Sequence, residues 1–428
     1  MTTVAEVRLW GRLIGAVALG EDETFATFQY NPEFVGSGIE LSPLKMPLAR
    51  RPYRFPELSL QSFYGLPGLL SDSLPDKFGN AIIDAWLNAQ GRPLQSLNAI
   101  ERLAYVGPRG MGGLEYVPSS RPLSEDVDLD IGELVRLAGL ILKERAGFET
   151  SLEEEGIADI LRVGTSAGGA RAKAVIAWNE ETGEVRSGQL NSGDGFEHWL
   201  LKFDGVSHNR DRELDDPQGF GLIEYAYFKM ARAAGIVMSR SRLMVENGRH
   251  HFMTKRFDRL DGGEKLHMQS LAALAHFDFN APGAYSYEQS FEVIRRLGLP
   301  QESMEQQFRR MAFNIIARNQ DDHVKNIAFL MDKRGQWSLA PAFDLTYSFN
   351  PQGAWTSTHQ MTMNGKREGF TMGDFIDTGK RAFLKQGQAR ALVEEVREAV
   401  RRWPEIAEEV GVIEQHRRQV EAHLRLEI

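Results

Sequence analysis

The sequence of 428 residues predicts an α+β fold in which a β-rich half precedes an α-rich half. Three observations carry this prediction. Residues 1 to about 120 have the pattern of short strands and turns, with frequent proline and glycine. Asn247-Gly248 lies between two apolar runs, which is the strongest short-range signal of a β-hairpin. Beyond Gly263 the apolar residues recur mainly at helical spacing.

The individual elements follow from apolar spacing and from turn residues. Strands are expected at 5–17 with a break at Gly11, at 24–30, at 172–178, at 197–203 and in a hairpin over 242–257. A helix over 78–86 begins after Pro75-Asp76, and an acidic stretch at 124–130 precedes a second helix. The remaining helices are expected at 131–145, 220–234, 285–297, 303–318 and 387–403, with a last amphipathic stretch near the C-terminus.

Composition excludes several classes of protein. Apolar residues make up 42% and charged residues 25%, which is typical of globular proteins rather than disordered or fibrous ones. The net charge of −9 argues against a nucleic-acid-binding surface over the whole protein. The absence of cysteine leaves only oxygen and imidazole ligands for any metal. No apolar run approaches the ~20 residues of a membrane helix and no signal peptide is evident, so we expect a cytoplasmic protein without membrane contact.

A glycine-rich segment from Gly164 to Lys173 precedes a predicted strand, where backbone amides are suited to hold phosphate oxygens. The segment fits neither the Walker nor the Rossmann pattern, so taken alone it also fits a flexible surface turn. Lys202 ends an apolar strand, and Glu224 follows 22 residues later on a predicted helix. Protein kinases use this strand-Lys and helix-Glu arrangement to hold phosphates, although a solvated Lys and Glu are the alternative.

The most informative stretch is NQDDHVKN at 319–326, followed by a predicted hairpin and Asp344. Asp321, four intervening residues, Asn326 and a second Asp after a hairpin have the spacing of a kinase catalytic loop. In that arrangement the first Asp orients the acceptor hydroxyl, while Asn326 and Asp344 supply oxygen ligands for Mg²⁺. A polar turn that caps a strand would not explain this spacing. His323 and Lys325 either contact phosphate or orient the loop.

In their order along the chain, these motifs resemble the HipA-type serine/threonine kinases, toxins of bacterial type II toxin–antitoxin modules. The resemblance spans essentially the whole chain. It rests on GLPGLLSDSLPD at 65–76, YVGPRGMG at 105–112, SAGGARAK at 166–173, Lys202, TKRFDR at 254–259, the 319–326 loop and AFD at 342–344. It implies a protein-kinase-like fold of two lobes with an extra N-terminal α+β subdomain. We expect this subdomain at 1–125, a β-rich nucleotide-binding lobe at 126–257 and a helical catalytic lobe at 258–428.

The resemblance also implies the roles of individual residues toward ATP and Mg²⁺. Asp321 resembles the catalytic residue, Asn326 and Asp344 resemble the Mg²⁺ ligands, and Glu224 is the expected ion-pair partner of Lys202. Ser166 occupies the autophosphorylation position, where added charge would oppose nucleotide binding, and Thr165 is the alternative acceptor. The expected nucleotide contacts are Thr165, Ser166, Gly168, Gly169, Lys173, Lys202, Lys255, Phe257, His323 and Lys325, with Lys255 and Phe257 at the adenine.

The partners implied by the resemblance are a helix-turn-helix antitoxin of the HipB type, operator DNA bound mainly through that antitoxin, and a protein substrate such as an aminoacyl-tRNA synthetase. Two alternative functions stay open at this point. One is a catalytically weak, kinase-like corepressor, against which the complete set of active-site residues argues. The other is a small-molecule phosphotransferase, which would share the catalytic loop but not the 65–76 string.

Overall fold

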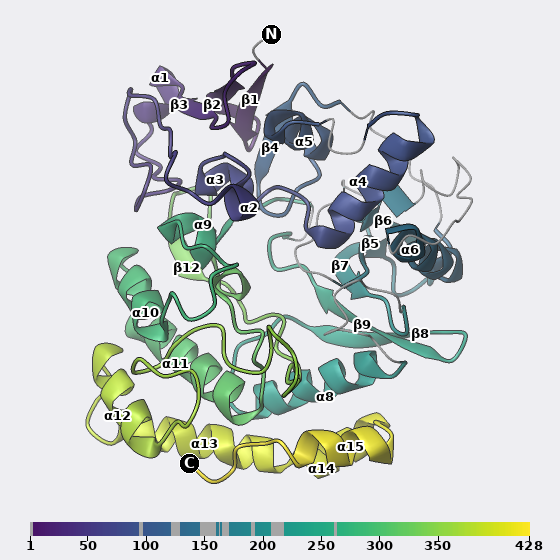
Figure 1. Ribbon diagram of the computed structural model, residues 1–428, viewed down its shortest axis with the longest axis vertical. Coiled ribbons are helices and arrows are strands. Elements are labelled where there is room, and N and C mark those ends of the chain that lie inside the picture. Colours follow the sequence, from purple (N-terminus) through teal and green to yellow (C-terminus); the bar gives the residue numbers. More distant parts are fainter. Residues whose placement is uncertain are drawn as a thin grey trace.

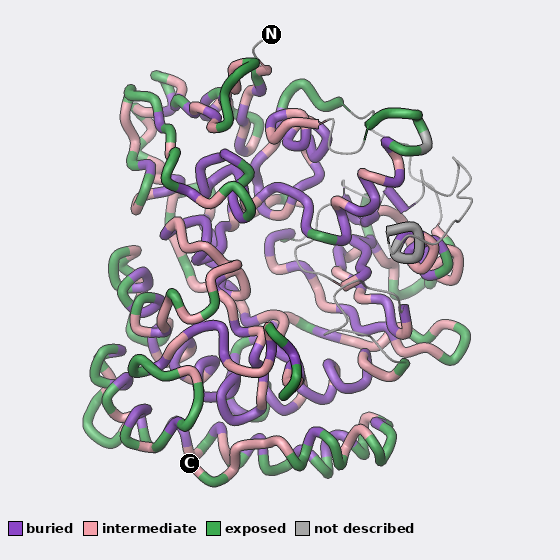
Figure 2. Tube along the Cα trace, viewed as in Figure 1, coloured by how far each residue is buried: buried purple, intermediate pink, exposed green. Residues whose placement is uncertain are grey.

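The computed structural model describes residues 3–93, 97–120, 129–145, 160–161, 163–164, 171–189, 193–206, 218–260 and 263–428. Within these ranges, three antiparallel sheets and a helical region form the α+β fold that the sequence predicts (Figure 1). The four-stranded sheet lies at one end of the molecule and the five-stranded sheet at its flank, and helices α10 to α15 fill the opposite end. The buried residues form a separate core in each part of the molecule (Figure 2).

The N-terminal sheet has four strands in the order β3-β2-β1-β4. The strands are β1 (Thr3–Leu9), β2 (Arg12–Leu19), β3 (Thr27–Tyr30) and β4 (Leu114–Val117). Trp10 and Gly11 both have positive φ, at 52° and 76°, which gives the tight turn that the Gly11 break predicted. The short helices of this part are α1 (Pro32–Val35), α2 (Leu60–Phe63), α3 (Gly68–Ser71) and α5 (Ala99–Val106).

The second sheet has five strands in the order β6-β5-β7-β9-β8. Its strands are β5 (Lys173–Trp178), β6 (Val185–Ser187), β7 (Glu197–Lys202), β8 (Ser241–Glu246) and β9 (Arg249–Lys255). Helices α4 (Lys77–Ala89) and α6 (Ile131–Arg145) share a buried core with one face of this sheet. Helix α4 thus belongs to the core of the second sheet, although it lies within the segment predicted as the N-terminal subdomain.

Helix α8 (Phe220–Ala233) packs against β8 and β9. A Cβ atom on Gly221 would lie 1.8 Å from the carbonyl oxygen of His250, so only glycine permits this close approach. The side chains of Trp199 and Leu201 enter the core shared with α4 and α6. Because neighbouring residues of a strand face opposite sides, Lys202 points to the other face, toward α8.

A small sheet in the order β10-β11-β12 lies between the N-terminal part and the helical part. The strands are β10 (His267–Ser270), β11 (Ala328–Met331) and β12 (Trp337–Leu339). The helices are α9 (Leu271–Ala275), α10 (Tyr287–Arg296), α11 (Gln301–Ile316), α12 (Met372–Arg381), α13 (Gln388–Arg401), α14 (Trp403–Val410) and α15 (Glu414–Glu421). A 3₁₀ turn over Val324–Asn326 joins α11 and the preceding loop to β11.

A buried ion network joins the N-terminal part to the rest of the chain. The Asp258 carboxylate accepts hydrogen bonds from Arg256, from Arg259 and from the Gly112 backbone N–H, the last at 2.7 Å. Arg259 in turn donates to the carbonyl oxygens of Gly110 and Gly112. Burial alone would raise the pKa of Asp258, but the two guanidinium groups outweigh it and hold that pKa well below its usual range. The strings at 105–112 and 254–259 are therefore two sides of one interface.

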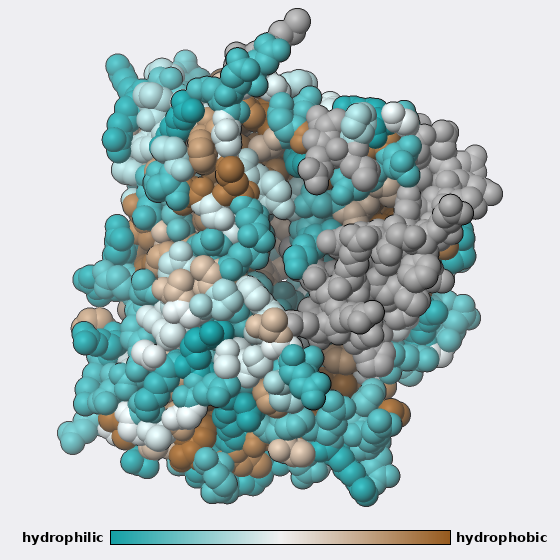
Figure 3. Space-filling view, in the orientation of Figure 1, coloured by the Kyte–Doolittle hydropathy of each residue, from teal (hydrophilic) through white to brown (hydrophobic). Residues whose placement is uncertain are grey.

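Among the described residues, none of the helices combines the length and the apolar character needed to cross a bilayer. The face shown in Figure 3 carries its hydrophobic residues in small groups among hydrophilic ones. Exposed large apolar side chains come from separated points of the chain: Val4, Leu60, Tyr64, Val117, Val237, Val245, Leu260, Phe383 and Ile413.

Replacing Asp258 with Asn should lower the free energy of unfolding by about 3–5 kcal/mol, because two buried guanidinium groups lose their shared anion. Urea denaturation measures this difference. Asp377→Asn is the matched control, since Asp377 pairs with Lys380 on the surface with 57% of its side chain exposed. The control should cost less than about 1 kcal/mol. Equal losses in the two variants would contradict a structural role for the Asp258 network.

Candidate active site

Lys202 lies where the second sheet meets the helical part. Its Nζ is 2.5 Å from Glu224 Oε1 on α8 and 2.5 Å from Asp344 Oδ1, which follows β12. Burial disfavours the charged ammonium, but the two carboxylates outweigh this effect and raise the pKa of Lys202. Arg171 approaches the other Glu224 oxygen at 4.0 Å. The sequence-predicted pair Lys202 and Glu224 therefore lies together, with Asp344 as a second anion.

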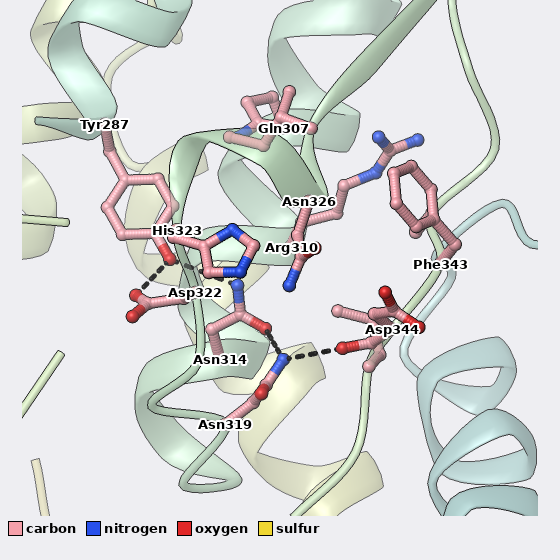
Figure 4. A pocket seen from close by; sticks show the side chains of 13 residues that line it. Tyr287, Gln307, Arg310, Asn314, Asn319, Asp322, His323, Asn326, Phe343 and Asp344 are labelled. Carbon is pink, nitrogen blue, oxygen red and sulfur yellow. Dashed lines mark hydrogen bonds between the residues drawn. The ribbon is translucent and has the colours of Figure 1, made fainter. Parts of the chain in front are cut away.

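Asp344 occupies a strained backbone position. Its φ is +52°, in the left-handed region that few non-glycine residues adopt. Asn319 Nδ2 donates to the Asp344 carbonyl oxygen at 3.2 Å and to Asn314 Oδ1 at 2.9 Å (Figure 4). Burial would raise the pKa of Asp344, but Lys202 and Lys173 outweigh it and lower that pKa. The carboxylate is thus held as an anion beside Lys202.

Asp321 lies in the loop between the turn that ends α11 and the 3₁₀ segment. Its Oδ1 accepts a hydrogen bond from the indole N–H of Trp355 at 2.6 Å, and His323 Nε2 lies 3.8 Å from the same oxygen. Its backbone carbonyl accepts from Asn326 Nδ2 at 2.9 Å. About a third of the Asp321 side chain, 30%, is exposed. A fixed but accessible carboxylate suits a residue that meets an incoming substrate group.

The neighbouring carboxylate, Asp322, is buried and fully engaged. It accepts hydrogen bonds from the Tyr287 hydroxyl at 2.6 Å, from the Gln360 backbone N–H at 2.7 Å and from His359 Nδ1 at 2.8 Å. Burial would raise the pKa of Asp322, but these donors outweigh it and lower that pKa. Asp322 therefore fixes the shape of the loop, while Asp321 stays accessible.

A pocket adjoins the loop, and Figure 4 shows the side chains that surround it. Its lining residues come from α10, α11, the 319–327 loop and the segment after β12: Tyr287, Gln307, Arg310, Asn314, Asn319, Asp322, His323, Asn326, Ile327, Ala342, Phe343, Asp344 and Leu345. Both predicted metal ligands, Asn326 and Asp344, border this pocket. Because Asn326 donates through Nδ2, its Oδ1 is the atom left to act as a ligand.

This donor set fits Mg²⁺ bound together with a nucleotide. Mg²⁺ takes one or two protein oxygens and completes its shell with phosphate oxygens and water. In the part of the chain that the structure describes, there is no group of three or more His, Asp or Glu side chains arranged for a metal. The Asn319 Oδ1 and His323 Nδ1 atoms at this site are buried without a hydrogen-bond partner. Such atoms are suited to a ligand or its water shell.

Three further residues predicted to contact the nucleotide are paired with other side chains of the protein. Lys173 is buried and pairs with Asp76, the N-cap of α4, at 3.1 Å. Lys255 pairs with Glu197 at 2.9 Å on the surface of the second sheet. Phe257 packs against Phe343, with ring centroids 5.7 Å apart, at the junction of the second sheet and the pocket segment.

The other predicted residues divide into two groups. His323 borders the pocket, and the Nζ of Lys325 lies 4.8 Å above the centroid of the Phe279 ring. Thr165, Ser166, Gly168 and Gly169 lie outside the described residues. Their roles as nucleotide contacts, and that of Ser166 as an autophosphorylation site, stay predictions.

Sequence reasoning missed Trp355, His359 and Tyr287. All three contact the acidic pair 321–322 from positions that are distant along the chain. Trp355 had one usable signal, since it is a single large aromatic residue within a polar stretch at 350–360. His359 and Tyr287 carry no local signal, because their partners come from other elements.

The different surroundings of the two carboxylates predict different effects on stability. Asp322→Asn should lower the free energy of unfolding by about 3 kcal/mol, because it removes the charge that three buried donors share. Asp321→Asn should cost less than about 1 kcal/mol, because one partly exposed hydrogen bond changes. Chemical denaturation of the two variants side by side tests this. Equal losses would contradict the division of roles.

Two models of protein families match this chain. The HipA N-terminal domain matches residues 5–117, and the HipA-like C-terminal domain matches residues 165–403. No curated protein matches the chain.

Solved structures extend the comparison to the fold. A chain of the Shewanella oneidensis MR-1 toxin–antitoxin complex of HipA, HipB and operator DNA matches with a TM-score of 0.68 and 16% identity, over 98% of this chain and 94% of that chain. The Helicobacter pylori proinflammatory kinase CtkA matches with a TM-score of 0.34 and 11% identity, over 60% of this chain and 93% of that chain, a likeness too low to assign a fold. The predicted α+β fold is confirmed and is shared with the matched chain of the Shewanella complex, and the N-terminal part corresponds to a HipA N-terminal domain. On the two family matches, which together span most of its length, the chain belongs to the HipA family.

Proposed function

We propose that this chain is an ATP- and Mg²⁺-dependent serine/threonine protein kinase that acts as the toxin of a toxin–antitoxin pair. The observation that carries the proposal is the convergence of Lys202, Glu224 and Asp344 from three separate elements. The accessible Asp321 and the amide of Asn326 lie on the adjoining loop. These are the side chains that a phosphoryl transfer site requires.

In this proposal each residue has one task. Lys202 binds nucleotide phosphate while Glu224 holds its ammonium in place. Asn326 and Asp344 hold Mg²⁺, which when bound neutralises charge on the transferred phosphoryl group. Asp321 accepts the proton of the acceptor hydroxyl. Asn319 holds the Asp344 backbone, so that the metal ligand keeps its unusual φ.

The nearness of Asp344 to Lys202 has a consequence for binding. Without nucleotide, the Lys202 ammonium is the counterion of the Asp344 carboxylate at 2.5 Å. Mg²⁺ and phosphate would replace that contact with two new ones, a metal–carboxylate contact and an ammonium–phosphate contact. The Lys202 ammonium and the Asp344 carboxylate would each keep an oppositely charged partner, which avoids the unfavourable free energy of an isolated buried ion.

The partners are also part of the proposal. The matched Shewanella oneidensis structure contains HipA, HipB and operator DNA. For this chain we propose a helix-turn-helix antitoxin of the same type, with operator DNA bound mainly through that antitoxin. The net charge of −9 supports this division, because DNA contact requires a surplus of basic residues. The proposed target is a protein such as an aminoacyl-tRNA synthetase, and Ser166 is the proposed site of inhibitory autophosphorylation.

Incubation with ATP and Mg²⁺, followed by mass spectrometry, tests the enzymatic part of the proposal. The wild type should carry phosphate on the peptide that contains Ser166. Asp321→Ala should slow transfer by about 10²-fold or more, because the acceptor hydroxyl loses its base. Asp377→Ala, on an exposed helix position, is the control with unchanged transfer. If the wild type and both variants bind ATP but none of them carries phosphate, the chain would instead be a kinase-like corepressor.

Nucleotide titration with and without Mg²⁺ tests the metal ligands. In the wild type, Mg²⁺ should strengthen ATP binding. Asp344→Asn should reduce this enhancement by about tenfold or more, because the carboxylate that the hard cation prefers is lost. Asp332→Asn, at the turn between β11 and β12, keeps the enhancement. An unchanged Mg²⁺ effect in Asp344→Asn would rule out Asp344 as a metal ligand.

A further inference from the structure

The segment between Asp344 and α12 places an indole directly on the proposed catalytic carboxylate. Trp355 Nε1 donates to Asp321 Oδ1 at 2.6 Å, so the indole N–H contacts the carboxylate directly. The two residues are 34 positions apart in the sequence. Local chain geometry therefore does not impose the contact, and the segment must be folded back to make it.

Further hydrogen bonds fasten this segment to the catalytic loop. The Gln360 backbone N–H donates to Asp322 Oδ1 at 2.7 Å, and Gln360 Nε2 donates to the Gln320 carbonyl at 3.2 Å. In the other direction, Gln320 Nε2 donates to the Thr356 carbonyl at 3.1 Å. Contacts immediately after and several residues beyond Trp355 thus fix its backbone. Several hydrogen bonds, and not the indole N–H alone, therefore hold Trp355 against the loop.

Aromatic rings continue from Trp355 along the accessible side of the loop. The His323 ring lies 6.4 Å from Trp355 and 6.1 Å from Phe279, centroid to centroid. His323 Nε2 and Trp355 Nε1 both approach Oδ1 of Asp321. Within the described part of the chain, no hydrogen bond is made to Oδ2 of this carboxylate. One oxygen is therefore held by the protein, and the other is left for a substrate.

We propose that Trp355 is a positioning residue that fixes the Asp321 carboxylate with Oδ2 toward the acceptor hydroxyl. This inference rests on the proposed kinase function. The terminal torsion of an aspartate is broad, so a carboxylate without a fixed donor would sample many orientations. In the transfer step the hydroxyl proton passes to Oδ2 and the acceptor oxygen bonds to the γ-phosphorus. The bond from that phosphorus to the bridging oxygen breaks, and ADP leaves.

Trp355→Phe tests the proposal, since it keeps an aromatic ring and removes the N–H donor. We expect kcat for transfer to fall by about tenfold to a hundredfold, the cost of a misplaced catalytic group, while KM for ATP is unchanged. Trp337→Phe is the matched control, because its indole N–H also donates one hydrogen bond, at 3.2 Å, but to the carbonyl of Glu40 in the N-terminal part and not to a residue of the site. The control should keep the wild-type kcat. The unfolding midpoints of both variants should lie within a few degrees of the wild-type midpoint.

Several outcomes would overturn the inference while leaving the kinase function intact. A Trp355→Phe enzyme with wild-type kcat would show that the indole does not position the carboxylate. A faster enzyme would show that the indole blocks Asp321. A fall in kcat together with a raised KM for ATP or a lower unfolding midpoint would assign Trp355 a structural role. If the wild type itself transfers no phosphate, the proposed function fails instead.

A second measurement does not depend on activity. The indole N–H signal of Trp355 in a proton–nitrogen correlation spectrum can be assigned from its loss in Trp355→Phe. Asp321→Asn weakens the charged acceptor, so that signal should shift while the Trp337 signal stays in place. An unshifted Trp355 signal would overturn the proposal, whatever the enzymatic result.

Discussion

The ammonium of Lys202 is the charge on which the arrangement of the candidate active site depends. The second sheet carries it into a buried position, where an unpaired cation would cost several kcal/mol. Two carboxylates keep it charged, one from α8 and one from the segment after β12. Three elements that are remote in sequence must therefore meet at one point. The same meeting point brings the 319–326 loop next to the end of the sheet, through the contact of Asn319 with Asp344.

The motifs of the N-terminal part are contacts with the rest of the chain. Asp76 ends the 65–76 string, caps α4 and pairs with Lys173 at the start of β5. Asp72, in the same string, accepts hydrogen bonds from the Ser270 backbone N–H and hydroxyl. Burial raises the pKa of both carboxyl groups. A chain without the N-terminal part would leave Lys173 and Ser270 without these partners, so the contacts of the two carboxylates stabilise the association of the two parts.

The sequence predicted the elements whose signals are local. The Asn247-Gly248 hairpin, α6 and α8 begin and end within a residue or two of the expected positions, because turn residues and apolar spacing decide them. The order of Lys202, Asp321, Asn326 and Asp344 also predicted which side chains would lie near one site. Spacing could not reveal that α4 packs on the second sheet, since that depends on which apolar faces meet in three dimensions. Nor could it reveal Trp355, whose partner is chosen by the fold of a long loop.

Asp321 and Asp322 show how environment, rather than residue type, assigns a role. The support for Asp322 reaches to the end of the chain, where Arg425 Nη1 lies 2.7 Å from His359 Nε2. A guanidinium only donates, so His359 Nε2 must be the acceptor and Nδ1 must carry the proton given to Asp322. Arg425 also donates to the carbonyl of Ile315 on α11. A directed chain of hydrogen bonds thus holds Asp322 in place, whereas the neighbouring Asp321 keeps 30% of its side chain exposed, as a group that meets a substrate requires.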